Sequence, residues 1–269
     1  MARSPVRLVV HGAAGRMGQR VIAGALGEPT EWQVVAAVER AGHPQSGADA
    51  GPLAGCPATG VAVADSWDVP ADVVIDFSLP EAVEGIIATC LAKRVPLVVA
   101  TTGLTAADHE RISEAARSIP VLQSPSMSLA VNISMDLVSR AARLLNRLGG
   151  RTDVEILECH HRHKEDAPSG TALKFGAIVR DALGQVREAH GRAGRPGARP
   201  ADEIGYHAIR AGDNPGEHTI LFGMEGESFT VNVRATNRDC YAQGALAAAA
   251  FLVDRPAGLY SMRDVLGLD

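Results

Sequence analysis

Residues 6–18 read VRLVVHGAAGRMG, and this stretch decides the fold. Its first part, Val6 to Val10, predicts a strand, and a helix is predicted from Arg16 to Leu26. Between them lie three glycines with the spacing G-x-x-G-x-x-G. Glycines let the backbone turn tightly and approach a pyrophosphate, which the N–H groups at the start of a helix bind. The stretch therefore favours a dinucleotide-binding turn over an ordinary glycine-rich turn in a βα unit.

An acidic residue follows the glycine turn at the distance expected for a residue that binds the cofactor's ribose. A second strand is predicted over Gln33 to Val38, and Glu39 comes next, where an acid binds ribose hydroxyls. Arg40 and Arg16 could each pair with a 2′-phosphate. Both NADH and NADPH are therefore candidate cofactors.

The first half of the chain continues to alternate strands with helices. Strands are predicted over Asp72–Phe77, Leu97–Ala100 and Val121–Leu122, and helices over Glu81–Lys93 and Ala106–Arg117. This alternation predicts a right-handed, doubly wound parallel sheet.

Two loops follow predicted strand ends, where ligands of such sheets bind. One is Asp76-Phe77-Ser78, and the other is Ala100-Thr101-Thr102-Gly103. Their backbone and hydroxyl groups could contact the second ribose, the nicotinamide amide or the substrate. The second loop could instead be only a capping turn, with Thr105 as the N-cap of the next helix.

The pattern changes after about residue 129, which predicts a second α+β domain with a mixed or antiparallel sheet. We expect helices over Val131–Leu148 and Thr171–Leu183, strands over Thr152–Glu158, Ile204–Arg210, His218–Phe222 and Ser228–Arg234, and an exposed loop over Arg187–Pro200. An apolar final helix, Ala242–Val253, should return to the first sheet. The expected domains are therefore 1–129 with 240–269, for the dinucleotide, and 130–239, for substrate binding and oligomerisation.

Composition excludes several classes of function. Among 269 residues the formal net charge is -5, which argues against non-specific nucleic-acid binding. No apolar run reaches the length of a membrane span, and the N-terminus carries no signal-peptide pattern. The four cysteines are widely spaced, as is typical of reduced thiols in a cytoplasmic protein.

The segment 158–171, ECHHRHKEDAPSGT, has three possible interpretations. In an extended conformation Cys159, His161 and His163 would share one face and could bind zinc, although no further ligand motif supports this. The segment could also be a solvated basic loop. The third possibility is an anion pocket with a proton donor.

The third interpretation accounts for more of the residues. Ser169 is a candidate N-cap, which would place its hydroxyl, the N–H of Gly170 and the N–H and hydroxyl of Thr171 at a positive helix end that binds carboxylate or phosphate. Lys164 and the histidines add cationic donors, and histidine commonly donates protons near neutral pH. Together with a dinucleotide domain, such a pocket describes a reductase of a small acidic substrate, with no metal.

These residues resemble a known family, the 4-hydroxy-tetrahydrodipicolinate reductases, formerly dihydrodipicolinate reductases. The resemblance rests on residues 12–18, on Thr101-Thr102-Gly103 and above all on 158–172, and it extends through RAGD at 210–213, GEHT at 216–219 and MRDVL at 262–266. It implies reduction of a cyclic dicarboxylate by NAD(P)H, with loss of water, in lysine and diaminopimelate biosynthesis. It also implies a homotetramer joined through sheets of the second domain.

The resemblance further implies roles for individual residues. His160 looks like the proton donor or acceptor, Lys164 a second proton donor, and His161 a ligand of a substrate carboxylate. Carboxylate contacts are also implied for Ser169, Gly170, Thr171 and Thr102, and cofactor contacts for Gly12, Ala13, Ala14, Gly15, Arg16, Met17, Glu39, Arg40, Phe77, Ala100, Thr101, Thr102, Ser124, Pro125, Ser126 and Met127. The family usually has Gly at Ala100 and Asn-Phe at Ser126-Met127.

The implied roles set a condition on the backbone. On a strand, His160 and Lys164 would lie on one side and His161 with His163 on the other. We therefore expect the chain to leave the strand at about His160, so that a loop can gather these side chains.

Overall fold

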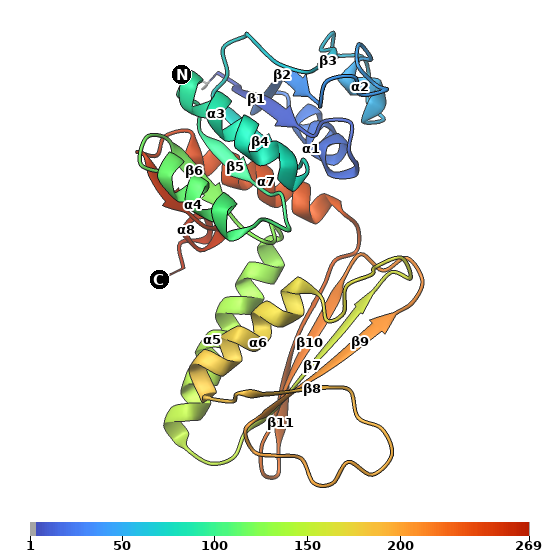
Figure 1. Cartoon of the computed structure of the whole chain (residues 1–269), viewed down its shortest axis with the longest axis vertical. Helices are drawn as coiled ribbons and strands as arrows, with labels where there is room; N and C mark the ends of the chain where they lie inside the picture. The colour runs from blue at the N-terminus through green and yellow to red at the C-terminus, as the bar shows by residue number, and fades with distance from the viewer. Residues whose placement is uncertain (1–3, 269) are drawn as a thin grey trace. The chain divides into compact units, whose positions relative to one another are not determined.

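The computed structural model describes residues 4–268, which form two compact units. The first unit extends to Leu129 and resumes at Arg238, and the second is Ala130–Asn237 (Figure 1). No helix within residues 4–268 combines the length and the hydropathy needed to cross a membrane.

Parallel strands form the sheet of the first unit, in the order β12-β6-β5-β4-β1-β2-β3. The central strand β1 (Val6–His11) pairs with β2 (Trp32–Val38) on one side and β4 (Val73–Asp76) on the other. Nucleotides bind such sheets at the carboxyl ends of the strands where the order reverses, which here is the end of β1. The other strands are β3 (Val63–Ala64), β5 (Leu97–Val99), β6 (Pro120–Gln123) and β12 (Gly258–Tyr260). The predicted doubly wound parallel sheet is confirmed.

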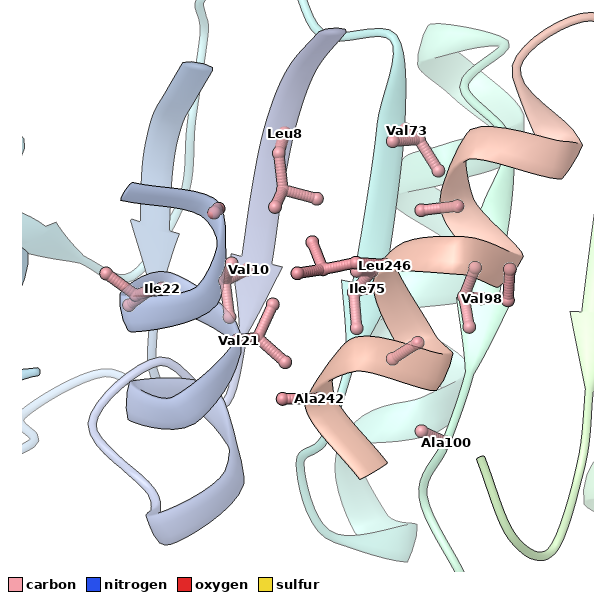
Figure 2. Packing of buried hydrophobic residues seen from close by; sticks show 14 of the residues in the cluster. Leu8, Val10, Val21, Ile22, Val73, Ile75, Val98, Ala100, Ala242 and Leu246 are labelled. Carbon is pink, nitrogen blue, oxygen red and sulfur yellow. The ribbon is translucent and has the colours of Figure 1, made fainter. Parts of the chain in front are cut away.

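Aliphatic side chains fill both faces of this sheet. On one face, Leu8 and Val10 pack against α1 (Arg16–Gly27) and α7 (Asp239–Leu252), as Figure 2 shows. The expected return of the last long helix to the first sheet is thus confirmed. Val9 points to the opposite face, which α3 (Val83–Lys93) and α4 (Ala106–Ala115) cover. Thr105 is the N-cap of α4, as the capping alternative for this loop proposed, and it forms a capping box with Asp108.

The sheet of the second unit is mixed, in the order β11-β10-β7-β9-β8. Its centre, β7 (Asp153–His160), runs parallel to β9 (Glu203–Arg210) and antiparallel to β10 (Glu217–Gly223). The outer strands are β8 (Arg187–His190) and β11 (Ser228–Arg234). One face packs against α5 (Leu129–Leu148) and α6 (Gly170–Leu183) (Figure 1).

Some predicted elements differ from the structure. The loop expected over residues 187–200 is wrong at its start, because Arg187–His190 pairs with β9 as an edge strand. The helix expected from Glu81 begins with a 3-10 turn, Pro80–Ala82, before α3. Four further short elements were not predicted, because each is too short to show a hydrophobic period: α2 (Ala50–Leu53), β3, β12 and α8 (Met262–Leu266).

Candidate active site

The glycine turn between β1 and α1 has the close backbone packing that its spacing predicts. Gly12 has a φ of 75°, and a Cβ added there would lie 2.5 Å from the carbonyl oxygen of Phe77. A Cβ on Gly18 would lie 2.1 Å from the carbonyl oxygen of Gly12. The next helix, α1, begins at Arg16 without a side-chain cap, so the N–H groups of its first turn can face an anion. The turn therefore fits a dinucleotide pyrophosphate.

Glu39 and the two candidate arginines lie at the same edge of the sheet. The Glu39 carboxylate accepts a hydrogen bond of 3.0 Å from the N–H of Ala14, within the glycine turn. Arg40 and Arg16 are exposed, as a 2′-phosphate contact requires. Ala13 is buried beneath the turn, and Met17 packs against the core.

A buried carboxylate, to which the sequence assigned no role of its own, organises the strand ends next to this turn. Asp76 is fully buried at the end of β4 and lies 2.7 Å from Nδ1 of His11. It accepts a hydrogen bond of 2.7 Å from the Thr101 hydroxyl and another of 3.2 Å from the N–H of Ser78. Asp76 thus ties together the ends of β1, β4 and β5, where cofactor contacts are expected.

The remaining expected cofactor residues lie in two loops of the first unit. Ala100 and Thr101 are buried, whereas Thr102 is exposed. In the second loop, the Ser124 hydroxyl donates a hydrogen bond of 2.8 Å to the carbonyl of Ser126. Pro125 is exposed, whereas the side chain of Met127 is buried in the core. Phe77 is half-buried beside Gly12. The structure therefore limits Met127 to contacts through its backbone.

The second unit places the histidine segment at the end of its central strand. The last residue of β7 is His160, and the chain then enters a loop that leads to α6. The expected exit from the strand at His160 is thus confirmed. In this loop the N–H of His161 donates to the carbonyl of Asn214 at 2.8 Å, and the N–H of Lys164 donates to the carbonyl of His161 at 3.1 Å.

Glu158 is the centre of the buried network around His160. Its side chain is 1% exposed, and its carboxylate accepts hydrogen bonds from both terminal nitrogens of Arg210, at 2.8 and 2.9 Å. The N–H of Ser169 donates to the same carboxylate at 3.1 Å, and Nδ1 of His160 forms a short hydrogen bond with it. Sequence reasoning assigned no role to Glu158 or Arg210. An acid in the same alternating register as Val154 and Ile156 was the available signal for Glu158.

The electrostatics of the network favour an ionised Glu158 and a neutral His160. Burial alone would raise the pKa of Glu158, but the hydrogen bonds from Arg210 and His160 outweigh it and hold the pKa below its usual value. Burial lowers the pKa of His160, and nearby Lys164 and Arg210 lower it further, against the opposing effect of Glu158. At neutral pH the imidazole is therefore neutral.

The start of α6 adjoins this network. Ser169 is the N-cap, as predicted, and its hydroxyl oxygen accepts the N–H of Ala172 at 3.2 Å. The same hydroxyl lies 3.1 Å from Nε2 of His218. Burial, and next the electrostatic influence of the neighbouring His160, lower the pKa of His218 to about 4, so its ring is neutral at neutral pH. The N–H groups of Gly170 and Thr171 lie in the first turn, which supplies no acceptor for them.

Lys164 lies in the same loop with its ammonium group partly exposed. Nζ donates a hydrogen bond of 2.8 Å to the carboxylate of Asp166, and this ion pair lowers the pKa of Asp166. The guanidinium of Arg210 donates to the backbone carbonyl of Asp166 at 2.6 Å. The structure therefore brings His160, Lys164 and Ser169 around Glu158 and Arg210.

The zinc alternative has little geometric support. Cys159 lies on the face of β7 opposite His160, and the rings of His161 and His163 are 6.2 Å apart. Within the described part of the chain, no three His, Cys, Asp or Glu side chains form a group that could hold a metal ion.

Family models match nearly the whole chain. Residues 6–127 match the model described as dihydrodipicolinate reductase, N-terminus, and residues 130–266 match the model for its C-terminus. A 4-hydroxy-tetrahydrodipicolinate reductase of Rhodopirellula baltica is 54% identical over 98% of this chain and 97% of its own. One of Alkalilimnicola ehrlichii is 46% identical over 97% and 99%.

Solved structures show the same similarity. A dipicolinate-bound dihydrodipicolinate reductase from Paenisporosarcina sp. TG-14 matches with a TM-score of 0.77 and 25% identity, over 96% of this chain and 97% of that one. A probable dehydrogenase from Thermotoga maritima matches with a TM-score of 0.61 at 11% identity, over 98% and 93% of the chains, and shows the shared fold alone.

Proposed function

The chain belongs to the dihydrodipicolinate reductase family. From this membership we infer that its activity is the NAD(P)H-dependent reduction of 4-hydroxy-tetrahydrodipicolinate to tetrahydrodipicolinate. This reaction belongs to lysine and diaminopimelate biosynthesis. The alternative substrate class, another amino or keto acid, is not favoured by relatives that are up to 54% identical over nearly the full chain.

The first unit binds the nicotinamide cofactor, which supplies the hydride. The N–H groups at the start of α1 bind its pyrophosphate, and Glu39 binds a ribose hydroxyl group. The support for this assignment is the turn itself, because a Cβ at Gly12 or Gly18 would collide with the backbone. Arg40 and Arg16 bind the 2′-phosphate of NADPH, and the loops at 100–102 and 124–127 contact the nicotinamide side.

The second unit binds the dicarboxylate substrate. The N–H groups of Gly170 and Thr171, with the Thr171 hydroxyl, receive one carboxylate at the positive end of α6. His161 contributes a further contact, and Thr102 is proposed as an additional carboxylate ligand. The Ser169 hydroxyl already caps α6 and binds His218, so its first role is to fix the start of the helix. The dipicolinate-bound relative supports a dicarboxylate ligand.

His160 and Lys164 handle protons. The ammonium of Lys164 donates a proton, and the neutral imidazole of His160 exchanges one through Nε2, since Nδ1 is bound to Glu158. The observation that carries this proposal is the link from His160 through Glu158 to the start of α6. It holds the proton-exchanging ring and the carboxylate-binding helix end in one network.

The assembly we propose is a homotetramer joined through the sheets of the second unit. The face of that sheet away from α5 and α6 carries Ile209, which is 48% exposed, beside the half-buried Leu157 and Leu221. Light scattering should give the mass of four chains, and Leu221→Glu should shift it downward. We also propose a cytoplasmic location, because all four cysteines are reduced thiols.

A coupled assay tests the reaction. Dihydrodipicolinate synthase generates the substrate in place, and the absorbance of NADH or NADPH is followed. Cofactor should be consumed only when the synthase and its substrates are present. An unchanged absorbance under those conditions would overturn the proposed function.

A further inference from the structure

Glu158 and Arg210, whose side chains are 1% and 19% exposed, form a largely buried ion pair whose position suggests more than a contribution to stability. A buried salt bridge gains little net stability, because the cost of desolvating both charges offsets their attraction. Glu158 stands between Ile156 and His160 in the row of β7 side chains that faces the core. The ion pair therefore lies directly beside the proposed catalytic histidine, His160.

Three neighbouring strands place the groups that meet there. Arg210 of β9 lies opposite His160 of β7 in parallel register, and His218 of β10 lies opposite Glu158 in antiparallel register. The rings of His160 and His218 are 5.2 Å apart, in an edge-to-face arrangement. The loop contributes Lys164, and the N-cap of α6 contributes the N–H of Ser169. Together with Glu158, these charged, titratable and polar groups surround His160.

The hydrogen bonds of Glu158 determine the protonation of its neighbour. Its two oxygens receive four donors: two from Arg210, one from Ser169 and one from His160. A carboxylate saturated in this way accepts only, so the proton of the bond to His160 resides on Nδ1. A neutral imidazole with a proton on Nδ1 has its lone pair on Nε2.

We propose that Glu158 and Arg210 are positioning residues for the reduction, which hold His160 in the Nδ1–H tautomer so that Nε2 is the nitrogen that exchanges the proton. Arg210 keeps Glu158 ionised and fixes the plane of its carboxylate by a two-point contact. A carboxylate bound to one nitrogen of a catalytic imidazole controls the tautomer in other enzyme classes by the same chemistry. The kinetic part of this proposal rests on the proposed function, whereas the tautomer does not.

Glu158→Gln tests the proposal most sharply. The amide nitrogen of glutamine would donate to Nδ1 of His160 and move the ring proton to Nε2. We expect kcat to fall by about 10²-fold or more, with the KM for NADH within about twofold of the wild type, because the cofactor binds the first unit. Loss of the nearby negative charge should also move the acid limb of the kcat/KM profile to lower pH.

The matched control is Glu155→Gln. Glu155 lies on the same strand and is also bound by arginines and a histidine, namely Arg192, Arg199 and His207, but it faces the other side of the sheet. This variant should keep the wild-type kcat per assembled molecule and the wild-type pH profile. Arg210→Lys, which keeps the charge and loses the two-point contact, should lower kcat while leaving the KM for NADH unchanged.

Nitrogen-15 NMR of the histidine rings gives a reading that requires no turnover. His160, assigned by comparison with His160→Gln, should show the Nδ1–H tautomer in the wild type and the Nε2–H tautomer in Glu158→Gln. An Nε2–H tautomer in the wild type would overturn the proposal even if the variant fails to fold. A Glu158→Gln enzyme with wild-type kcat and an unchanged tautomer would also overturn it. Loss of the coupled activity in the wild type, with the tautomers as expected, would instead contradict the proposed reaction.

Discussion

Gly12 and Phe77 meet backbone to backbone, so closely that a Cβ at residue 12 would lie 2.5 Å from the carbonyl oxygen of Phe77. Residue 12 also has a left-handed φ of 75°. The turn that is proposed to bind the pyrophosphate therefore has no room for any residue other than glycine at this position.

Gly12→Ala should weaken both folding and cofactor binding. The left-handed backbone and the clash with Phe77 should lower the free energy of unfolding by roughly 1–3 kcal/mol. Because the turn must shift, the Kd for NADH should rise as well. Thermal unfolding and titration of cofactor fluorescence measure the two effects. Gly27→Ala is the control, since no atom lies within 4 Å of a Cβ there. Equal cofactor affinity in Gly12→Ala and the wild type would contradict the role of the turn.

Arg40→Ala should discriminate between the two cofactors. Loss of a charge-assisted contact with the 2′-phosphate should raise the KM for NADPH about tenfold and leave that for NADH nearly unchanged. Steady-state kinetics with both cofactors measure this ratio. Arg16→Ala, tested in parallel, shows whether the second exposed arginine shares the role. An equal effect of Arg40→Ala on NADH and NADPH would exclude a 2′-phosphate contact.

Asp76→Ala should disorganise the cofactor edge of the first sheet. The substitution leaves His11, Thr101 and the N–H of Ser78 without their buried acceptor, which should cost about 3 kcal/mol of unfolding free energy. The KM for NADH should also rise. Asp76→Asn retains hydrogen bonding and should recover part of both losses. Denaturant unfolding and kinetics test this, and a variant with wild-type stability and KM would show that the network has no such role.

His218 should make the second unit less stable in acid. Above about pH 6.5 the ring is neutral in both the folded and the unfolded states. Between pH 6.5 and the folded pKa of about 4, the unfolded chain binds a proton that the folded chain does not. The free energy of unfolding should therefore fall as the pH falls through this window, by up to about 3 kcal/mol.

The variant His218→Gln should remove this contribution. Its unfolding free energy should decline less than that of the wild type between pH 6.5 and 4, whereas the exposed His109→Gln should follow the wild type. Chemical denaturation at several pH values makes the comparison. The same pH slope in His218→Gln and the wild type would show that the ring titrates normally.

Local patterns were sufficient to predict the central strands of the first sheet, because β1, β2 and β4 are short aliphatic runs separated by helices with clear periods, but the short edge strands β3 and β12 were missed. The exit from β7 at His160 also followed from the requirement that neighbouring side chains serve one pocket. The edge strand Arg187–His190 was missed, because its residues are polar and its pairing with β9 is what makes it a strand.

The candidate site was only partly predictable, because its support comes from distant strands. His160 and Lys164 are found in one conspicuous segment, but Arg210 is 52 residues from Glu158 and His218 is 49 residues from Ser169. No period in a single sequence pairs these residues. The structure adds the register of β9 and β10 against β7, which places both side chains beside the histidine segment.

The most direct test of the account follows the hydride itself. The synthase-coupled reaction is run with NADPH that carries deuterium at both positions of nicotinamide C4, so that either face delivers label, and the product is analysed by mass spectrometry. The account predicts one deuterium in tetrahydrodipicolinate from the wild-type enzyme, and a greatly reduced rate of incorporation in Lys164→Ala, which should still bind NADPH. A product without deuterium, or no product while the labelled cofactor stays intact, would contradict the central claim that this chain reduces the dicarboxylate with NAD(P)H.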